Sequence, residues 1–247
     1  MSTNQKTWVF IAILVLVTLS VSLGTMSSHS QQNSPGKPVT NPTPDFGKYP
    51  VADLSAPEPS SLAERAERSL KNKRYDRHAM VLQNPGPDDT LVVISDAEPE
   101  PAAIPSETSR LVIIGSILSS NAFVSNDKSG VYSEYSLYIQ SVLKNDKAKE
   151  RHPGETIIVD RSGGYVKYPK GQKILYINDW QDLPELNGRY LIFLDKEGSE
   201  QNPNYKIITA YQFKDNQVLP LDRTSRFAEF KGMAESTFVK RVGTSSK

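Results

Sequence analysis

Apolar and polar residues alternate along much of this chain, most regularly in the segment "VYSEYSLYIQSVLKND", residues 131–146. Side chains of a strand point to opposite faces in turn, so this alternation predicts a strand. Its odd positions are the more apolar and are expected on the core. The even face carries Tyr132 and Tyr138 among Glu, Ser and Gln. We expect these two tyrosines either as ordinary side chains of an exposed sheet face or as a ligand-binding or partner-binding face.

Further short apolar runs, separated by Gly, Pro and Asn turns, predict more strands. They lie at about residues 90–95, 110–125, 155–160, 165–168, 173–178, 189–195, 205–213 and 218–222. Gly115 interrupts one strand, which indicates a bulge, a bend or a close approach of backbone. The turn "RSGG" predicts a hairpin between the third and fourth strands of the globular part, because glycine tolerates positive φ. The nearly continuous apolar run "RYLIFLD" predicts a strand buried on both sides.

Two helices are expected beside the strands. Ser61-x-x-Glu64 is a capping-box pattern, and it predicts a helix over about 61–74. The apolar stripe of this helix, Leu62, Ala66 and Leu70, is thin, so the helix is expected to dock marginally at best. A second short helix is expected near 234–242, with Phe238 docked. About seven strands and one terminal helix predict a mainly β fold, either a small β-barrel or a sandwich.

The N-terminal segment Trp8–Gly24 has no charged residue and follows Lys6. It is near the shortest length that spans a bilayer, so it is expected to be a transmembrane anchor or, with Ser22 and Gly24 at a cleavage site, a signal peptide. Lys6 favours a cytoplasmic N-terminus, residues 1–7. The remainder is then anchored outside the cytoplasm by a single pass, or secreted if the leader is cleaved.

The rest of the chain divides by composition. Residues 25–59 are rich in Ser, Pro, Asn and Thr, and they are expected to be a disordered linker. Residues 60–78 are predicted as the marginal helix and 79–247 as an extracytoplasmic β domain. The basic run at 71–78 suits a solvated helix end, or contact with anionic lipid or wall polymer.

The overall charge and the absence of cysteine exclude several classes of function. The formal net charge is +1, which argues against a nucleic-acid partner because such domains usually carry a strong basic excess. With no cysteine, the chain can form neither a disulfide nor a thiolate nucleophile, and it has no zinc-thiolate site and no lipid-modified cysteine.

No established catalytic, metal-binding or cofactor-binding motif occurs in the sequence. His152, in the turn "KERHPGE", is expected to be a solvated loop residue. Asp179, Asp182 and Glu185 cluster in "NDWQDLPE" and could hold a cation through oxygen ligands, although turn residues of this kind are ordinary in loops. We therefore predict no catalytic residue, cofactor or metal ligand.

The segments "LVIIGSILSSNAFVSNDKSGVYSEYSLYIQSVLKND", "GGYVKYPKG" and "GRYLIFL" resemble a family of uncharacterised exported or membrane-anchored β-domain proteins of soil bacteria. The resemblance covers residues 90–242. The strand layout is also distantly similar to netrin-like modules, the OB-type barrels of tissue inhibitors of metalloproteinases. Those inhibitors contact the protease metal through an N-terminal cysteine, which this chain lacks, so no inhibitory residue carries over.

These observations predict a non-enzymatic, membrane-tethered binding or interaction module outside the cytoplasm. Its ligand would be a protein, a peptide or a cell-wall polymer, bound on the face around Tyr132 and Tyr138. The alternative is an extracytoplasmic hydrolase, in which two or more of His152, Asp179, Asp182 and Glu185 meet in one cleft.

Overall fold

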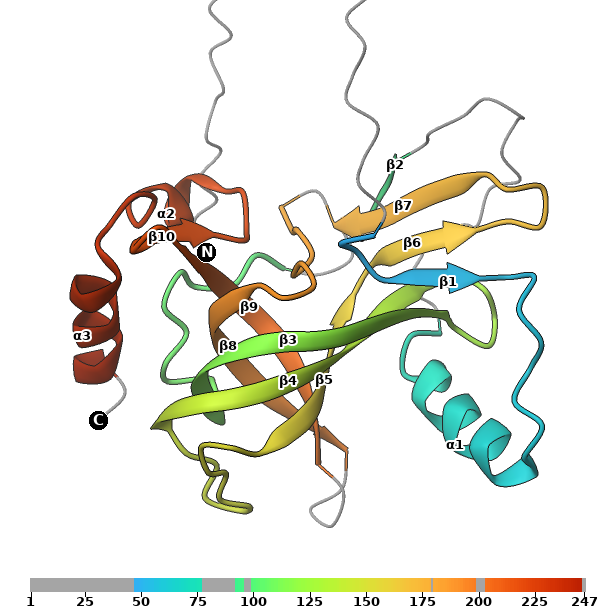
Figure 1. The fold of residues 1–247 in the computed structure, drawn as a ribbon, viewed down its shortest axis with the longest axis horizontal. Helices are drawn as coiled ribbons and strands as arrows, with labels where there is room; N and C mark the ends of the chain where they lie inside the picture. Colours follow the sequence, from blue (N-terminus) through green and yellow to red (C-terminus); the bar gives the residue numbers. More distant parts are fainter. Residues whose placement is uncertain (1–46, 77–91, 96–98, 179, 199–202, 246–247) are drawn as a thin grey trace, which may run out of the picture. The chain divides into compact units, whose positions relative to one another are not determined.

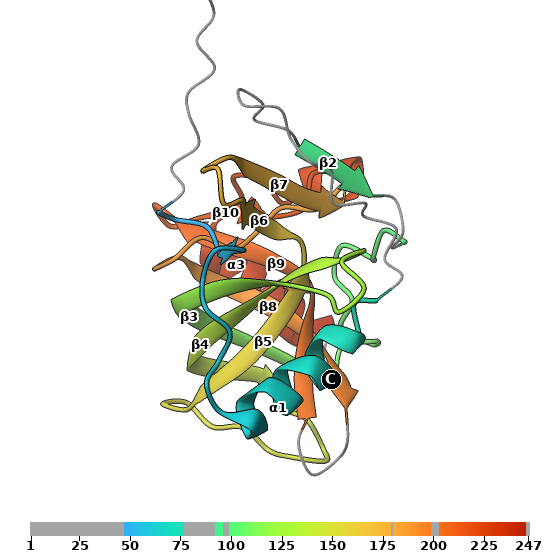
Figure 2. The ribbon, with the colours of Figure 1, turned by 90° about the vertical axis from the view of Figure 1, so that its right-hand side faces the viewer.

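Strands dominate the computed structural model, which describes residues 47–76, 92–95, 99–178, 180–198 and 203–245 (Figures 1 and 2). All of these residues belong to one compact unit, Pro44–Lys247. The mainly β fold with a short C-terminal helix is therefore as predicted. The expected anchor at residues 8–24 lies outside the described residues. Among the described helices, none combines the length and the apolar character that a membrane span requires.

Five strands pair in a closed order, which we call the five-strand ring. They are β3 (Leu111–Val124), β4 (Val131–Lys144), β5 (Thr156–Ser162), β8 (Arg189–Gly198) and β9 (Pro203–Lys214). β3 pairs with β4, β4 with β5, β5 with β9, β9 with β8, and β8 with β3 again. The β5–β9 pairing is parallel and short, from Val159–Tyr205 to Asp160–Lys206, and the other four are antiparallel.

A smaller sheet has the order β1 (Val51–Asp53), β6 (Gly164–Lys167), β7 (Lys173–Asn178), β2 (Val92–Ser95). Its β1 strand lies inside the segment predicted as a disordered linker, so the compact unit begins earlier than composition indicates. The predicted hairpin between residues 155–160 and 165–168 is wrong, because β5 and β6 belong to different sheets. Gly163 and Gly164, with φ of 99° and 153°, form the corner between the two sheets.

The five-strand ring encloses the first hydrophobic core. Tyr135, Leu137 and Ile139 of β4 point into this core and are fully buried, so the prediction for the odd face of this strand is confirmed. On β8, Ile192 faces the same core, whereas Leu191 and Phe193 belong to a second core outside the ring. The strand is thus buried on both sides, as its continuous apolar run predicts.

The second core lies between the ring and the C-terminal elements, which are β10 (Gln217–Pro220), α2 (Ser225–Ala228) and α3 (Glu235–Ser245). Phe238 of α3 is fully buried against Tyr211, at 4.5 Å between ring centroids. Phe230 packs edge-on against the same tyrosine. The predicted final helix and its docked phenylalanine are confirmed, and the helix extends three residues further than predicted.

Gly115 marks an irregularity of β3. The register of the β3–β4 pair shifts between Ile114 and Gly115, and a Cβ at Gly115 would lie 2.4 Å from the carbonyl oxygen of Tyr138. The interpretation of this glycine from sequence is therefore confirmed, because the neighbouring strand approaches more closely than a side chain would allow.

α1 (Leu62–Lys73) begins where the capping box predicts, and the Ser61 hydroxyl accepts the Glu64 amide at 3.4 Å. Its apolar stripe, however, does not dock. Leu62 and Leu70 are 77% and 71% exposed, and the helix has no buried residue. α1 instead contacts the ring through its polar side, because that side meets charged partners on β4 and β5.

Candidate functional site

α1 lies against the five-strand ring (Figure 2). Its polar side covers Tyr132, one of the two tyrosines predicted on an exposed face. Arg68 donates to the Tyr132 hydroxyl at 3.0 Å, and that hydroxyl donates to Asn72 at 2.8 Å. Tyr75, just after the helix, stacks on the Tyr132 ring with 4.1 Å between centroids. Tyr132 is 0% exposed, and this burial raises its pKa to about 12. Its placement on an exposed face is thus wrong, because periodicity within one strand carries no information about a helix that covers it.

Ion pairs complete the contact between α1 and the ring. Arg68 forms a bidentate salt bridge with Glu134 of β4, with hydrogen bonds of 2.8 and 3.2 Å. Arg74 donates to Asp160 of β5 at 2.9 Å, and the Tyr75 hydroxyl donates to the same carboxylate at 2.7 Å. Asp160 is almost fully buried, and these two donors help to stabilise its charge there.

Tyr138, the second predicted tyrosine, remains 39% exposed, and it has apolar neighbours that sequence analysis did not single out. Ser136 pairs with Ile158 of β5, while Leu118 is the extra residue of a bulge in β3 beside Ser136. Leu118 and Ile158 are 51% and 48% exposed. We call these four residues, Leu118, Ser136, Tyr138 and Ile158, the outer face. Three of the six exposed large hydrophobic side chains of the described residues lie on it.

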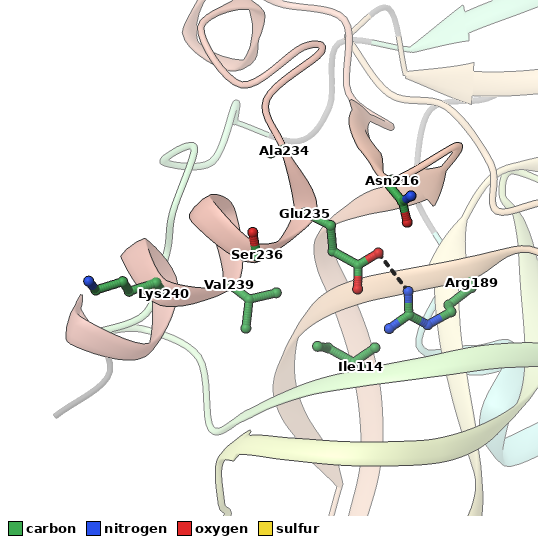
Figure 3. A pocket seen from close by; sticks show the side chains of 8 residues that line it. All are labelled: Ile114, Arg189, Asn216, Ala234, Glu235, Ser236, Val239 and Lys240. Carbon is green, nitrogen blue, oxygen red and sulfur yellow. Dashed lines mark hydrogen bonds and ion pairs between the residues drawn. The ribbon is translucent and has the colours of Figure 1, made fainter.

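A cleft of about 730 Å³ opens between α3 and the ring, at one end of the outer face (Figure 3). Ile114 of β3 and Val239 of α3 provide its apolar lining, and Arg189 of β8 and Glu235 of α3 provide an ion pair at 2.8 Å. The volume is within the usual range for small-ligand sites, which combine apolar lining with a few placed polar groups. We call it the α3 cleft.

Arg189 is held in one orientation by three contacts. Its Nε donates to Gln140 at 2.8 Å, its Nη1 donates to Glu235, and its guanidinium carbon lies 5.0 Å from the centroid of the Phe213 ring. Gln140 in turn donates to Ser116 at 3.0 Å. Ser116 is the β3 partner of Tyr138, so these bonds connect the α3 cleft with the outer face.

The β9–β10 turn and the second core place α3 beside the cleft. Asp215 and Asn216 in this turn have φ of 51° and 59°, the left-handed conformation that tight two-residue hairpins require and Asn and Asp tolerate. The Glu235 amide donates to the Asn216 carbonyl at 3.0 Å. Burial of Phe238 and Val242 in the second core then fixes the face that α3 presents to Arg189.

At the α1 end of the outer face is a smaller pocket of about 290 Å³. Ile158 forms one wall and Lys71 of α1 another, together with Arg151 and Tyr205. Lys71 lies 3.4 Å from Glu67 and 3.6 Å from Glu134, so its charge is shared between two carboxylates. Pocket, outer face and cleft therefore adjoin one another on β3, β4 and β5.

The residues named for the hydrolase alternative lie in two different loops. The backbone amide of His152 donates to Glu155 within the β4–β5 loop, and the imidazole is exposed. Asp182 pairs with Arg223 at 2.8 Å, and Glu185 accepts the Tyr49 hydroxyl at 3.3 Å, both in the β7–β8 connection. Burial, followed by the charges of these two carboxylates, raises the pKa of Tyr49 to about 12. Asp179 lies outside the described residues.

No group of three or more His, Asp or Glu side chains among the described residues is arranged to hold a metal ion. A scan with protein-family models and comparisons with curated proteins and solved structures gave no match to the chain. Sequence analysis did not single out Leu118, although alternation along β3 is a signal that could have placed it on the same side as Ser116. Nothing in the sequence pairs Arg189 with Glu235, 46 residues away.

Proposed function

We propose that this chain is a non-enzymatic, membrane-tethered module outside the cytoplasm that binds a protein or peptide partner through its outer face. The main support for this proposal is the cluster of Leu118, Tyr138 and Ile158, three large apolar side chains exposed on one sheet face. Covering clustered exposed apolar side chains with a partner removes apolar surface from water, and exposed apolar patches mark interaction sites.

The surroundings of the cluster support a protein partner. Ser116, Ser136 and Gln140 lie between and beside the apolar side chains, as at interfaces with an apolar centre and a polar rim. Leu118 and Ile158 are aliphatic and match aliphatic or aromatic side chains of a protein. The charged groups beside the face are paired with one another, which suits orientation of a partner rather than transfer of protons.

We also propose that the five-strand ring is an OB-type barrel. The five-strand ring closes in an order that agrees with this five-stranded Greek-key architecture, whose second and third strands commonly carry ligand sites. These strands correspond to β4 and β5 here. The near-neutral charge of the chain favours a protein ligand over the nucleic acids that many such barrels bind.

The test is capture of partners from envelope extract of the source cells by the full chain and by a Leu118→Ser/Ile158→Ser variant. We expect the wild type to retain a specific protein at moderate salt and the double variant to lose at least about 90% of it, since truncation of hot-spot side chains at the centre of an interface costs about 2 kcal/mol or more. Tyr138→Ala should weaken capture in the same direction.

Leu54→Ser, a substitution of a comparably exposed leucine next to β1 of the smaller sheet, is the matched control and should leave capture unchanged. Equal capture by wild type and double variant would refute the outer face as the binding surface. Loss of capture only with Leu62→Ser/Leu70→Ser would move the interaction to α1. Retention of wall polymer instead of a protein would overturn the partner class.

A further inference from the structure

One end of the α3 cleft is formed by the guanidinium of Arg189, whose N–H donors are not all used within the part of the chain that the structure describes. A guanidinium has five N–H donors, and the hydrogen bonds that Arg189 makes to described residues use only those on Nε and Nη1, toward Gln140 and Glu235. Among the described residues Nη2 has no hydrogen-bond partner, and in Figure 3 the second terminal nitrogen is turned toward Ile114 and Val239. The side chain of Arg189 is 38% exposed, so a ligand can reach this nitrogen.

The fixed orientation of Arg189 matters for the kind of ligand. Its planar fork matches a carboxylate, and the contacts with Gln140, Glu235 and Phe213 hold that plane before a ligand arrives. Little side-chain freedom is then lost on binding. Glu235 already shares its charge with Arg189, and Lys240 on the neighbouring turn of α3 adds a second positive charge at the rim. The cleft therefore favours a ligand with a single negative charge.

The remaining lining is apolar. Ile114 is almost fully buried, and Val239 packs against the second core, so neither can turn away from the cleft. A ligand that places an apolar side chain between them removes apolar surface from water, at about 25 cal/mol per Å². The cleft thus combines one carboxylate-binding group with an apolar lining that suits one apolar side chain.

The exit from the cleft suits a chain rather than an isolated small molecule. Gln140 accepts from Arg189 of the cleft and donates to Ser116, the β3 partner of Tyr138, so hydrogen-bonding side chains lead from the cleft to the outer face. A chain leaving the cleft would cross this polar row and reach the exposed apolar cluster.

We propose that the α3 cleft binds the C-terminal carboxylate and the last, apolar side chain of a peptide chain. Arg189 receives the carboxylate, Ile114 and Val239 receive the side chain, and the preceding residues extend over the outer face. This inference rests on the proposed function, because it names the part of the partner that binds first to the site described above.

The test measures binding of N-acetyl-Ala-Ala-Leu, as the free acid and as the C-terminal amide, to the full chain in mild detergent by isothermal titration calorimetry. We expect saturable binding of the acid and at least tenfold weaker binding of the amide. Arg189→Gln should abolish this preference for the acid. Equal binding of both peptides, or binding of neither, would overturn the proposal.

A second pair of variants keeps the proposal testable if Arg189→Gln disturbs α3. Ser236 is exposed on the first turn of α3 and lines the cleft. Ser236→Glu suits a helix N-terminus but adds a negative charge beside the carboxylate site, so binding of the acid should fall at least fivefold. Ser236→Gln has a side chain of similar size without the charge and should bind like the wild type. Unchanged binding by Ser236→Glu would contradict the assignment.

The two proposals fail in different ways. Leu118→Ser/Ile158→Ser could lose the captured protein while the free acid and the amide bind alike. That result would support the outer face as the partner surface and refute carboxylate binding by the α3 cleft. If the acid is preferred but the double variant captures its partner normally, the cleft binds a carboxylate and the outer face is not the partner surface.

Discussion

The rings of Tyr75 and Tyr132 stack face to face, with 4.1 Å between centroids and 5° between planes, although 57 positions of sequence separate them. Both side chains are almost completely buried. The hydroxyl of Tyr75 also donates to the buried carboxylate of Asp160. This pair, rather than the leucines of α1, attaches the helix to the five-strand ring.

Tyr75→Ala should destabilise the docking of α1. The substitution removes the stacked ring and leaves Asp160 with one donor fewer, and truncation of a buried aromatic typically costs about 3–5 kcal/mol. We expect faster hydrogen exchange throughout α1 and a urea midpoint below that of the wild type. Tyr75→Phe, which removes only the hydroxyl, should cost about 1–2 kcal/mol.

Leu70→Ala is the control on the same helix. Leu70 is exposed, so this change should alter stability by no more than about 0.5 kcal/mol. A larger loss for Leu70→Ala than for Tyr75→Ala would show that α1 docks through its apolar stripe after all.

Arg161→Met should be among the most damaging single changes in the ring. Arg161 and Asp222 form an ion pair in which both side chains are almost fully buried, and Thr209 donates to the same carboxylate at 2.6 Å. Removing one partner leaves the other charge buried, which costs about 3–5 kcal/mol. Urea unfolding measures the loss.

The double variant Arg161→Met/Asp222→Leu should recover roughly half of that loss, because no unpaired charge then remains inside. Arg223→Met removes a partner of the exposed pair with Asp182 and should cost less than about 1 kcal/mol. A double variant less stable than Arg161→Met would contradict this account.

Gly115→Ala should destabilise the β3–β4 pair. The added methyl group would meet the Tyr138 carbonyl at 2.4 Å, and relief of such overpacking typically costs about 1–3 kcal/mol. Thermal unfolding measures the effect. Gly243→Ala is the matched control, because no atom within 4 Å would obstruct its Cβ in α3. It should stabilise the protein by about 0.5–1 kcal/mol, since alanine favours helices. Equal effects of the two changes would contradict the close approach at Gly115.

Stability should fall as the pH rises above about 10. Burial raises the pKa of Tyr132 from 10.0 to about 12, so between these values the unfolded chain has lost a proton that the folded chain retains. Stability from this tyrosine is complete below pH 10 and is lost as the pH rises through 12, at about 1.4 kcal/mol per pH unit. Tyr49 should act in the same direction.

Denaturant titrations at several alkaline pH values test this slope. Absorbance of tyrosinate should appear only together with unfolding for Tyr132, and Tyr132→Phe should flatten the slope measurably. A midpoint that stays constant between about pH 10 and 12 would argue against burial of these hydroxyls.

Local patterns in the sequence predicted most of the elements, because their causes are local. Alternation within residues 131–139 is produced by the strand geometry itself, and the Ser61 cap acts on an amide three residues away. The burial of Phe238 followed from its spacing along one helix face. The close approach at Gly115 was also readable, since glycine inside a strand has few other causes.

Tertiary structure alone decided how the faces are used. The two leucines of α1 suggest a docking side. Arg68, Arg74 and Tyr75 instead contact charged and aromatic side chains on β4 and β5. In the two ion pairs the partners are 66 and 86 positions apart in the sequence. The glycines after β5 direct the next strand into another sheet because Gly163 and Gly164 allow a corner as readily as a hairpin turn.

The sequence by itself determined that this protein is mainly β, where most strands run, and which side of β4 faces the core. Only the tertiary structure buried Tyr132, left Tyr138 exposed beside Leu118 and Ile158, and brought Arg189 to Glu235 in the α3 cleft. The physical reason is that periodicity records the environment of one element averaged along its length. Contacts between elements far apart in the chain depend on the order in which strands pair, which no local pattern specifies.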